Sequence, residues 1–363
     1  MSSSTSLITD SESLQRLAEQ MSAASCVALD TEFMRERTYR AELCLLQVAT
    51  PAGPVCVDPL ALADLAPLRA PLAAPGCEKV LHAARQDLEV LAPLAGALTP
   101  VFDTQVAAAL AGFPAQVGYG ELVRRLLDHE LPKAHTRADW SRRPLSPEQI
   151  EYALDDVRYL LPVRELLLAQ LHRLGRERWL AEELAGIADP AALAVQPERA
   201  WLRLKGLQGL DPARAALAQS LAAWRERRAI ARNRPRGWIL DDGVLREMVL
   251  RVPRSAAQLA AVPAIPEGVV RNSGEELLAL VSAANVADPP PPLPRRERPD
   301  PQFNALVKRL AELAQHVARE HGIAAEVLAT RRDLETVARG ESGAAVLAGW
   351  RREVLGERLL AAL

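Results

Sequence analysis

Short apolar runs and amphipathic stretches alternate along the first third of the chain. We expect the apolar runs to form strands, at residues 27–33, 44–49, 55–58, 79–81 and 100–103. We expect helices between and after them, at residues 61–72, from residue 86 and from residue 104. Residues 7–20 predict a short strand and then a helix, with Asp10 or Ser11 as its N-cap. This order is typical of an α/β domain with a mixed sheet covered on both faces.

From residue 122 to the end, apolar positions recur almost everywhere at helical spacing. A proline-rich run at residues 288–294 predicts a stiff, extended linker within this helical part. We place domain boundaries near residue 205 and inside the proline-rich run. The expected segments are an α/β domain at 1–205, a small all-α domain at 206–288, a linker at 289–301 and a second all-α domain at 302–363.

Charge and cysteine content narrow the possible classes of function. The 363-residue chain has a formal net charge of −2, so any nucleic-acid surface must be local. Its four cysteines form no C-x-x-C pair and lie in or near apolar segments, which predicts buried, reduced thiols rather than disulfides or zinc ligands. The polar N-terminus is not a signal peptide, and no apolar run reaches spanning length. We therefore expect a cytoplasmic protein that does not bind a membrane.

Two acidic residues, Asp30 and Glu32, interrupt the first long apolar run. On a strand, residues two apart point to the same face, roughly 7 Å from each other. Carboxylates on an inner strand repel each other and are costly to bury unless a cation lies between them. Hard divalent cations prefer oxygen ligands, so the pair indicates a metal site.

A second acidic position lies on a helix that begins near Ser146. Pro147 suits the first helical position, and Gln149 completes a capping box with Ser146. Tyr152 and Asp156 are then i and i+4 neighbours on one face. Asp155 is rotated a further 100°, and we expect it to face solvent. A phenol and a carboxylate on one turn can hold both a water and a cation.

Three further residues are ambiguous when taken alone. Asp87 follows the strand at 79–81 and is either a member of the acidic cluster or an exposed first-turn acid. Asp103 is best interpreted as the N-cap of the next helix. His82, at a strand end, is more typical of a structural hydrogen-bonding residue than of a catalyst.

Together these motifs resemble those of the DEDD 3′→5′ exonucleases. Residues 26–33 resemble the first motif and residues 81–91 the second, while Tyr152-x-x-x-Asp156 resembles the third motif of the branch marked by tyrosine. Residues 133–140 and 143–145 are similar to the lead-in to that motif in the ribonuclease D family, although His135 departs from the small acidic or polar residue expected there. Residues 221–226 with 238–240 resemble an HRDC domain, and residues 328–335 resemble part of a second, diverged one.

The resemblance implies a ribonuclease H-like exonuclease domain followed by two HRDC-like domains. It also implies two divalent cations, Mg²⁺ or Mn²⁺, bound by Asp30, Glu32, Asp87 and Asp156. Tyr152 would orient the attacking water, and nucleoside 5′-monophosphates would leave the 3′ end of an RNA. The expected substrates are tRNA precursors, with no obligate protein partner. Contacts to the terminal nucleotide are expected from Thr31, Phe33, Tyr39 and His82, although a plain core position is an equally good interpretation of Phe33.

The basic stretch at 225–236 admits two interpretations. Arg225, Arg228 and Arg232 are candidates for contacts with RNA phosphates, and a solvated helix face is the equally weighted alternative. Trp224 and Trp238 are expected in the core of the helical domain. Two other functions compete with RNA hydrolysis: DNA 3′→5′ exonuclease activity, since the same site cleaves both polymers, and a catalytically silent RNA-binding scaffold.

Overall fold

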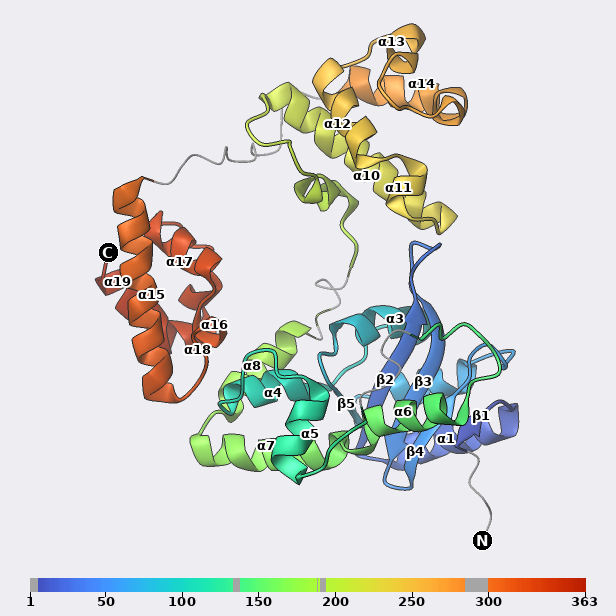
Figure 1. The fold of residues 1–363 in the computed structure, drawn as a ribbon, viewed down its shortest axis with the longest axis vertical. Helices are drawn as coiled ribbons and strands as arrows, with labels where there is room; N and C mark the ends of the chain where they lie inside the picture. The colour runs from blue at the N-terminus through green and yellow to red at the C-terminus, as the bar shows by residue number, and fades with distance from the viewer. Residues whose placement is uncertain (1–5, 133–137, 188, 190–193, 285–299) are drawn as a thin grey trace. The chain divides into compact units, whose positions relative to one another are not determined.

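The protein divides into two compact units in the computed structural model, which describes residues 6–132, 138–187, 189, 194–284 and 300–363 (Figure 1). The first, here called the sheet unit, comprises Met1–Met34, Leu43–Leu193 and Asp300–Leu363. The second, here called the helical unit, comprises Arg35–Glu42 and Ala194–Pro299. Nearly all of the expected proline-rich linker lies outside the described residues. The domain boundaries near residue 205 and inside the proline-rich run stay predictions.

A six-stranded mixed sheet, as predicted, forms the centre of the sheet unit. Its strands are β1 (Leu7–Ile8), β2 (Cys26–Met34), β3 (Glu42–Thr50), β4 (Gly53–Val57), β5 (Glu78–Leu81) and β6 (Val101–Asp103). The order across the sheet is β1-β4-β3-β2-β5-β6. β2, β5 and β6 pair in parallel, whereas β3 and β4 are antiparallel. The strand that carries Asp30 and Glu32 therefore lies inside the sheet, with β3 and β5 as neighbours.

Helices cover both faces of this sheet. The helices of the α/β part are α1 (Ser11–Ala23), α2 (Arg69–Ala73), α3 (Arg85–Ala95), α4 (Thr104–Leu110), α5 (Tyr119–Leu127), α6 (Pro147–Arg158), α7 (Leu160–Leu174) and α8 (Glu177–Ile187). Val27 and Leu29 of β2 pack in one core cluster with α1 and α3. Ala28, on the opposite face, belongs to the cluster formed with α4 and α7. By strand alternation, Asp30 and Glu32 share the face of Ala28.

One local prediction in this part needs correction, and the choice between two predicted N-caps is settled. Residues 61–72 do not form one helix: a 3-10 turn, η1 (Ala66–Leu68), precedes α2. The carboxylates of Asp58 and Asp64 accept from the backbone N–H groups of Leu60 and Ala66, and these local bonds compete with helix formation. Asp10, whose carboxylate accepts from the Ser13 N–H at 2.9 Å, is the N-cap of α1, so Ser11 is its first residue.

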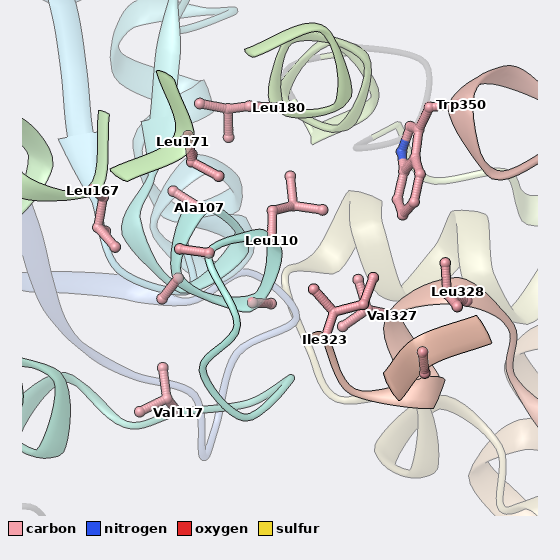
Figure 2. Close-up of a cluster of buried hydrophobic side chains, with 14 of the residues drawn as sticks. Ala107, Leu110, Val117, Leu167, Leu171, Leu180, Ile323, Val327, Leu328 and Trp350 are labelled. Atoms are coloured by element: carbon pink, nitrogen blue, oxygen red, sulfur yellow. The ribbon is translucent and has the colours of Figure 1, made fainter. Parts of the chain in front are cut away.

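The C-terminal helices also belong to the sheet unit. They are α15 (Pro301–His321), α16 (Ala325–Leu328), α17 (Arg331–Ala338), α18 (Gly349–Arg351) and α19 (Glu357–Ala361), with the short turns η3 (Ala345–Leu347) and η4 (Arg352–Gly356). Figure 2 shows Leu110, Leu171 and Leu180 of the α/β part in one buried cluster with Ile323, Val327 and Trp350. The rings of Trp179 and Trp350 stack with centroids 4.3 Å apart. These apolar contacts fix residues 300–363 to α4, α7 and α8.

The helical unit has a core of its own. It contains the 3-10 segment η2 (Pro197–Arg203) and the helices α10 (Pro212–Arg232), α11 (Arg236–Ile239), α12 (Asp242–Arg251), α13 (Ala256–Ala260) and α14 (Glu267–Ala283). Trp224 is buried in this core, as predicted. Trp238 was expected there too, and that prediction is wrong, because its side chain is 61% exposed. Ile239 and Leu240, the next two residues, fill the core position instead.

The described residues bear on two broader predictions, which concern the cysteines and membrane-spanning helices. All four cysteines are free thiols, in agreement with the prediction, and three of them are buried. No helix in the described ranges is long and apolar enough to cross a membrane.

Candidate active site

Four carboxylates from β2, α3 and α6 come together in the sheet unit. Burial raises the pKa of Asp30 well above its usual range, and the negative charges of Asp87, Asp156 and Glu32 raise it further. Burial, with repulsion from Asp156 and Asp87, raises the pKa of Glu32 to about 8. Residues far apart in the sequence thus share one electrostatic environment, and the predicted clustering of these four acids is what the structure shows.

Asp87 is held in the cluster by its neighbours. It lies in the first turn of α3 and is 6% exposed, so the alternative of an exposed first-turn acid is wrong. The hydroxyl of Thr31, between Asp30 and Glu32 on β2, donates to Asp87 Oδ1 at 2.5 Å. Burial raises the pKa of Asp87 to about 6, although the Thr31 hydrogen bond opposes the shift.

The loop before α3 depends on Asp103. This carboxylate accepts from the backbone N–H groups of Ala83 and Ala84, at 3.1 and 2.9 Å. It also accepts from Gln105 N at 2.8 Å, which confirms its predicted role as the N-cap of α4. Ala83 has φ 57°, a left-handed conformation that costs energy without Gly. Asp103 therefore stabilises the turn that aims Asp87.

The helix α6 begins as its sequence predicts. Ser146 Oγ accepts from Gln149 N at 3.2 Å, and Gln149 Oε1 accepts from Ser146 N at 2.9 Å. With Pro147 at the first helical position, this capping box fixes the phase of the helix. Tyr152 and Asp156 consequently meet on one face and share a hydrogen bond. Burial raises the pKa of Asp156 to about 7 and also raises that of the Tyr152 phenol.

Asp155 does not face solvent, contrary to the prediction. Its side chain is 12% exposed and forms an ion pair with Arg158. Its backbone carbonyl accepts from the Tyr119 hydroxyl at 3.0 Å. The reason is tertiary: Tyr119 of α5 and the guanidinium of Arg158 contact Asp155, so the buried side of α6 is wider than its apolar residues indicate. Asp155 is neutralised by Arg158, whereas Asp156 joins the acidic cluster.

Arg143 fixes the segment before α6, a role that the sequence did not reveal. Its guanidinium donates to both carboxylate oxygens of Asp58, at 2.6 and 2.7 Å. It also donates to the backbone carbonyls of Trp140 and Cys44, at 2.7 and 2.6 Å. Trp140, held in this way, stacks on Tyr152 with ring centroids 6.2 Å apart. The sequence held two signals of this role: an arginine between two predicted elements, and a single aspartate directly after a strand.

Comparisons with known proteins agree with these motifs. The family model for a 3′-5′ exonuclease matches residues 5–172, and the HRDC domain model matches residues 214–281. Ribonuclease D of Acidiphilium cryptum is 42% identical over 363 residues, which cover 98% of this chain and 92% of the relative. Ribonuclease D of Gluconacetobacter diazotrophicus is also 42% identical, with the same two shares covered. This chain belongs to the ribonuclease D family.

A solved structure extends the similarity to the whole fold. The crystal structure of Escherichia coli RNase D, described as an exoribonuclease involved in structured RNA processing, matches with a TM-score of 0.85 and 32% identity. The match covers 98% of each chain. Like the rest of the ribonuclease D family, the chain is a 3′→5′ exoribonuclease, a hydrolase of phosphodiester bonds, and its exonuclease and HRDC parts have the fold class expected from the sequence.

In this member of the ribonuclease D family, the predicted contacts with the terminal nucleotide need revision. Tyr39 is buried in the core of the helical unit and donates from its hydroxyl to Glu226, so it has no free face for a base. Both ring nitrogens of His82 are engaged, with Thr104 Oγ1 at 2.9 Å and the Val117 carbonyl at 3.0 Å. These contacts favour the structural interpretation of His82. Phe33 is half-buried on β2.

The expected phosphate contacts separate into three cases. Arg225 is buried and donates to Asp242 and to the Leu240 carbonyl, so the prediction that it contacts RNA is wrong. Arg228 pairs with Glu276 at 2.7 Å, and its guanidinium lies over the Trp224 ring. Arg232 is exposed. The lead-in residues 133–137, His135 among them, lie outside the described residues.

The acidic cluster fits a divalent cation by its chemistry. Every candidate ligand is a carboxylate, which is the oxygen donor that Mg²⁺ and Mn²⁺ prefer. Within the described ranges, no three His, Cys, Asp or Glu side chains converge closely enough to hold one ion by themselves. Mg²⁺ does not require such a cage, because it commonly binds through one or two carboxylates together with water and substrate phosphates. Burial is the main cause of the raised pKa values, and repulsion within the cluster adds to it at Asp30 and Glu32; a cation would favour the charged carboxylates.

Proposed function

We propose that Asp30, Glu32, Asp87 and Asp156 bind two divalent cations, Mg²⁺ or Mn²⁺, and that this site removes single nucleotides from the 3′ end of RNA. The observation that carries the proposal is the convergence of four carboxylates from three elements, each with a raised pKa. Such an arrangement costs stability in the absence of a cation, so a structural role alone does not account for it.

The protein's own residues have distinct parts in the reaction. Tyr152 remains protonated at neutral pH, because burial raises its pKa. Its hydroxyl bonds to Asp156, and the phenol oxygen can still accept a hydrogen bond from a water. Phenol and carboxylate together thus orient the attacking water toward the terminal phosphodiester. Bound cations supply the remaining chemistry: they acidify water and neutralise charge on the leaving 3′ oxygen. The products are nucleoside 5′-monophosphates.

Asp30→Asn tests the site, because it removes a negative charge with almost no change in shape. We expect the variant to lose Mg²⁺-dependent release of mononucleotides while it keeps the circular dichroism spectrum of the parent. Calorimetric titration with Mg²⁺ should show weakened or absent binding. Glu19→Gln, which changes an exposed carboxylate on α1, is the matched control and should retain full activity. Retained activity in Asp30→Asn would contradict the proposal.

We further propose tRNA precursors as substrates. The involvement of the Escherichia coli relative in structured RNA processing supports this class. The helical part at residues 302–363, proposed as a diverged HRDC-like domain, would serve the same substrates. A 3′-extended tRNA precursor, incubated with and without Mg²⁺ and sequenced at its ends, tests the proposal. Trimming that stops near the mature 3′ end supports it, whereas equal degradation of an unstructured RNA and a matched DNA contradicts it.

A further inference from the structure

An indole on the helical unit is held out in solvent by a well-anchored segment. Trp238 is 61% exposed although it lies on α11, next to the buried residues Ile239 and Leu240. The backbone N–H of Trp238 donates to the Pro235 carbonyl at 2.9 Å, so the backbone at this point is fixed. A large aromatic ring that is exposed on an anchored helix leaves apolar surface in water, which is unfavourable unless a ligand covers it.

One arginine lies over this indole, and two more belong to the same junction. Asn233, with φ 47°, ends α10 in a left-handed conformation. Its side-chain oxygen accepts from the backbone N–H groups of Tyr39 and Arg40, at 3.1 and 3.0 Å. The junction brings Arg40 next to Arg232 and Arg234, the chain neighbours of Asn233. The Arg234 guanidinium lies over the Trp238 ring, 5.7 Å from its centroid. We call Arg40, Arg232, Arg234 and Trp238 the Arg–Trp patch.

The charges of the patch are left uncompensated within the described residues. Neighbouring arginines on the same unit are each neutralised by an acid: Arg225 by Asp242, Arg227 by Glu198, Arg228 by Glu276 and Arg236 by Glu226. Among the described residues, Arg40, Arg232 and Arg234 form no ion pair, and all three are exposed. The C-terminal end of α10, with its partial negative charge, tolerates this concentration of cations.

We propose that the Arg–Trp patch binds single-stranded RNA, with one base stacked on Trp238 and successive phosphates on the three arginines. Aromatic rings interleaved with basic groups are the means by which proteins hold single strands without reading their sequence. An acidic protein segment would neutralise the arginines but would supply no base to stack on the exposed indole. The inference rests on the proposed function, since it supplies a second contact for the same substrate.

The test measures RNA affinity separately from hydrolysis. A fluorescently labelled, unstructured 12-nucleotide RNA is titrated with the full chain carrying Asp30→Asn, in EDTA, over a range of salt concentrations. Adding Trp238→Ala should weaken binding roughly tenfold, as loss of one stacked base does, while Trp238→Phe keeps most of the affinity. Replacing the three arginines by Ala should lower the slope of log Kd against log salt by about 2, since each phosphate contact contributes about 0.7.

Arg254→Ala provides the matched control. Arg254 is an exposed arginine of the same unit that lines a hollow with Ala213 and Arg214, at the start of α10. Arg214 and Arg232 are separated by 18 helical residues, hence by about 27 Å. The control should leave both affinity and salt slope unchanged, and thermal unfolding should show that every variant folds.

Unchanged affinity and salt slope in both Trp238→Ala and the triple arginine variant would overturn the proposal and leave a protein partner as the occupant of the patch. This failure is distinguishable from failure of the proposed function, because the latter is measured as mononucleotide release by Asp30→Asn in Mg²⁺, independently of the binding assay.

Discussion

The hydroxyl of Thr31 donates a 2.5 Å hydrogen bond to the carboxylate of Asp87, across 56 positions of sequence. Thr31 lies between Asp30 and Glu32 on β2, is buried, and by strand alternation points to the opposite face of the sheet. The bond joins the first acidic motif to the second. It also favours the charged form of Asp87 against the effect of burial.

Thr31→Val, which keeps the shape and removes the donor, should weaken Mg²⁺-dependent activity. Groups that orient a metal ligand typically contribute about 10- to 100-fold to metal affinity or activity. We expect the Mg²⁺ concentration for half-maximal activity to rise by about tenfold or more. Thr31→Ser restores a hydroxyl at the same position and should recover most of the loss. If Val and Ser behave alike, the hydrogen bond does not position Asp87.

The acidic cluster should make stability depend on pH in an unusual direction. The pKa values of Glu32, Asp87 and Asp156 are raised to about 8, 6 and 7. At pH values between 4 and 8 the folded state therefore holds protons that the unfolded state has lost. The free energy of unfolding contributed by these groups falls as pH rises through this window. In EDTA, the melting temperature should thus decline from pH 5.5 to pH 8, apart from effects of the rest of the chain.

Added Mg²⁺ isolates the contribution of the cluster. Cations bind deprotonated carboxylates and stabilise the folded state by mass action. The Mg²⁺-induced rise in melting temperature should be larger at pH 8 than at pH 5.5, and Asp156→Asn should reduce it. A rise that is equal at both pH values and in the variant would place Mg²⁺ binding elsewhere.

Arg143 and Asp58 should contribute strongly to stability. The Asp58 side chain is 3% exposed, so removal of its partner leaves a buried, unpaired carboxylate. Such losses typically cost about 3–5 kcal/mol. Arg143→Met should lower the free energy of unfolding by about 3 kcal/mol in a denaturant titration. Arg142→Met, at an exposed neighbour, should change it little. Equal effects of the two substitutions would show that the ion pair is not what holds this segment.

Tyr152→Phe tests the role of the phenol hydroxyl. The ring keeps its stacking contact with Trp140, so the fold should be preserved. Loss of a group that orients the attacking water should lower kcat by about 10²-fold or more. Calorimetry should show Mg²⁺ binding close to that of the parent. Tyr159→Phe is the control, because that hydroxyl contacts His129 and not the acids. Activity within threefold of the parent in Tyr152→Phe would contradict the assigned role.

The sequence was sufficient where a structure depends on neighbouring residues. Alternation on β2 placed Asp30 and Glu32 on one face, and the capping box at Ser146 fixed the phase of α6. Asp103 was identified as an N-cap from its position alone. These features follow from local geometry, so one strand or one helical turn contains the information that predicts them.

The errors arose where distant elements decide burial. The backbone carbonyl of Asp155 accepts a hydrogen bond from Tyr119 of α5, a contact that no periodicity within α6 reveals. Tyr39 is held in the helical unit by Glu226, a residue far along the chain. Arg225 is buried because Asp242 and the Leu240 carbonyl receive its donors. Trp238 is the opposite error, since it was expected in the core and is exposed. Its apolar neighbours Ile239 and Leu240 supply the buried side chains.

The most direct measurement compares two adjacent residues of α6. Asp156→Asn and Asp155→Asn are equally conservative, but only Asp156 belongs to the acidic cluster, whereas Asp155 is paired with Arg158. The rate of 5′-monophosphate release from the 3′ end of an RNA is measured for both variants in Mg²⁺. The proposed site predicts that Asp156→Asn falls to background and Asp155→Asn retains most of the parent's rate. Retained activity in Asp156→Asn would contradict a catalytic site built from these four carboxylates.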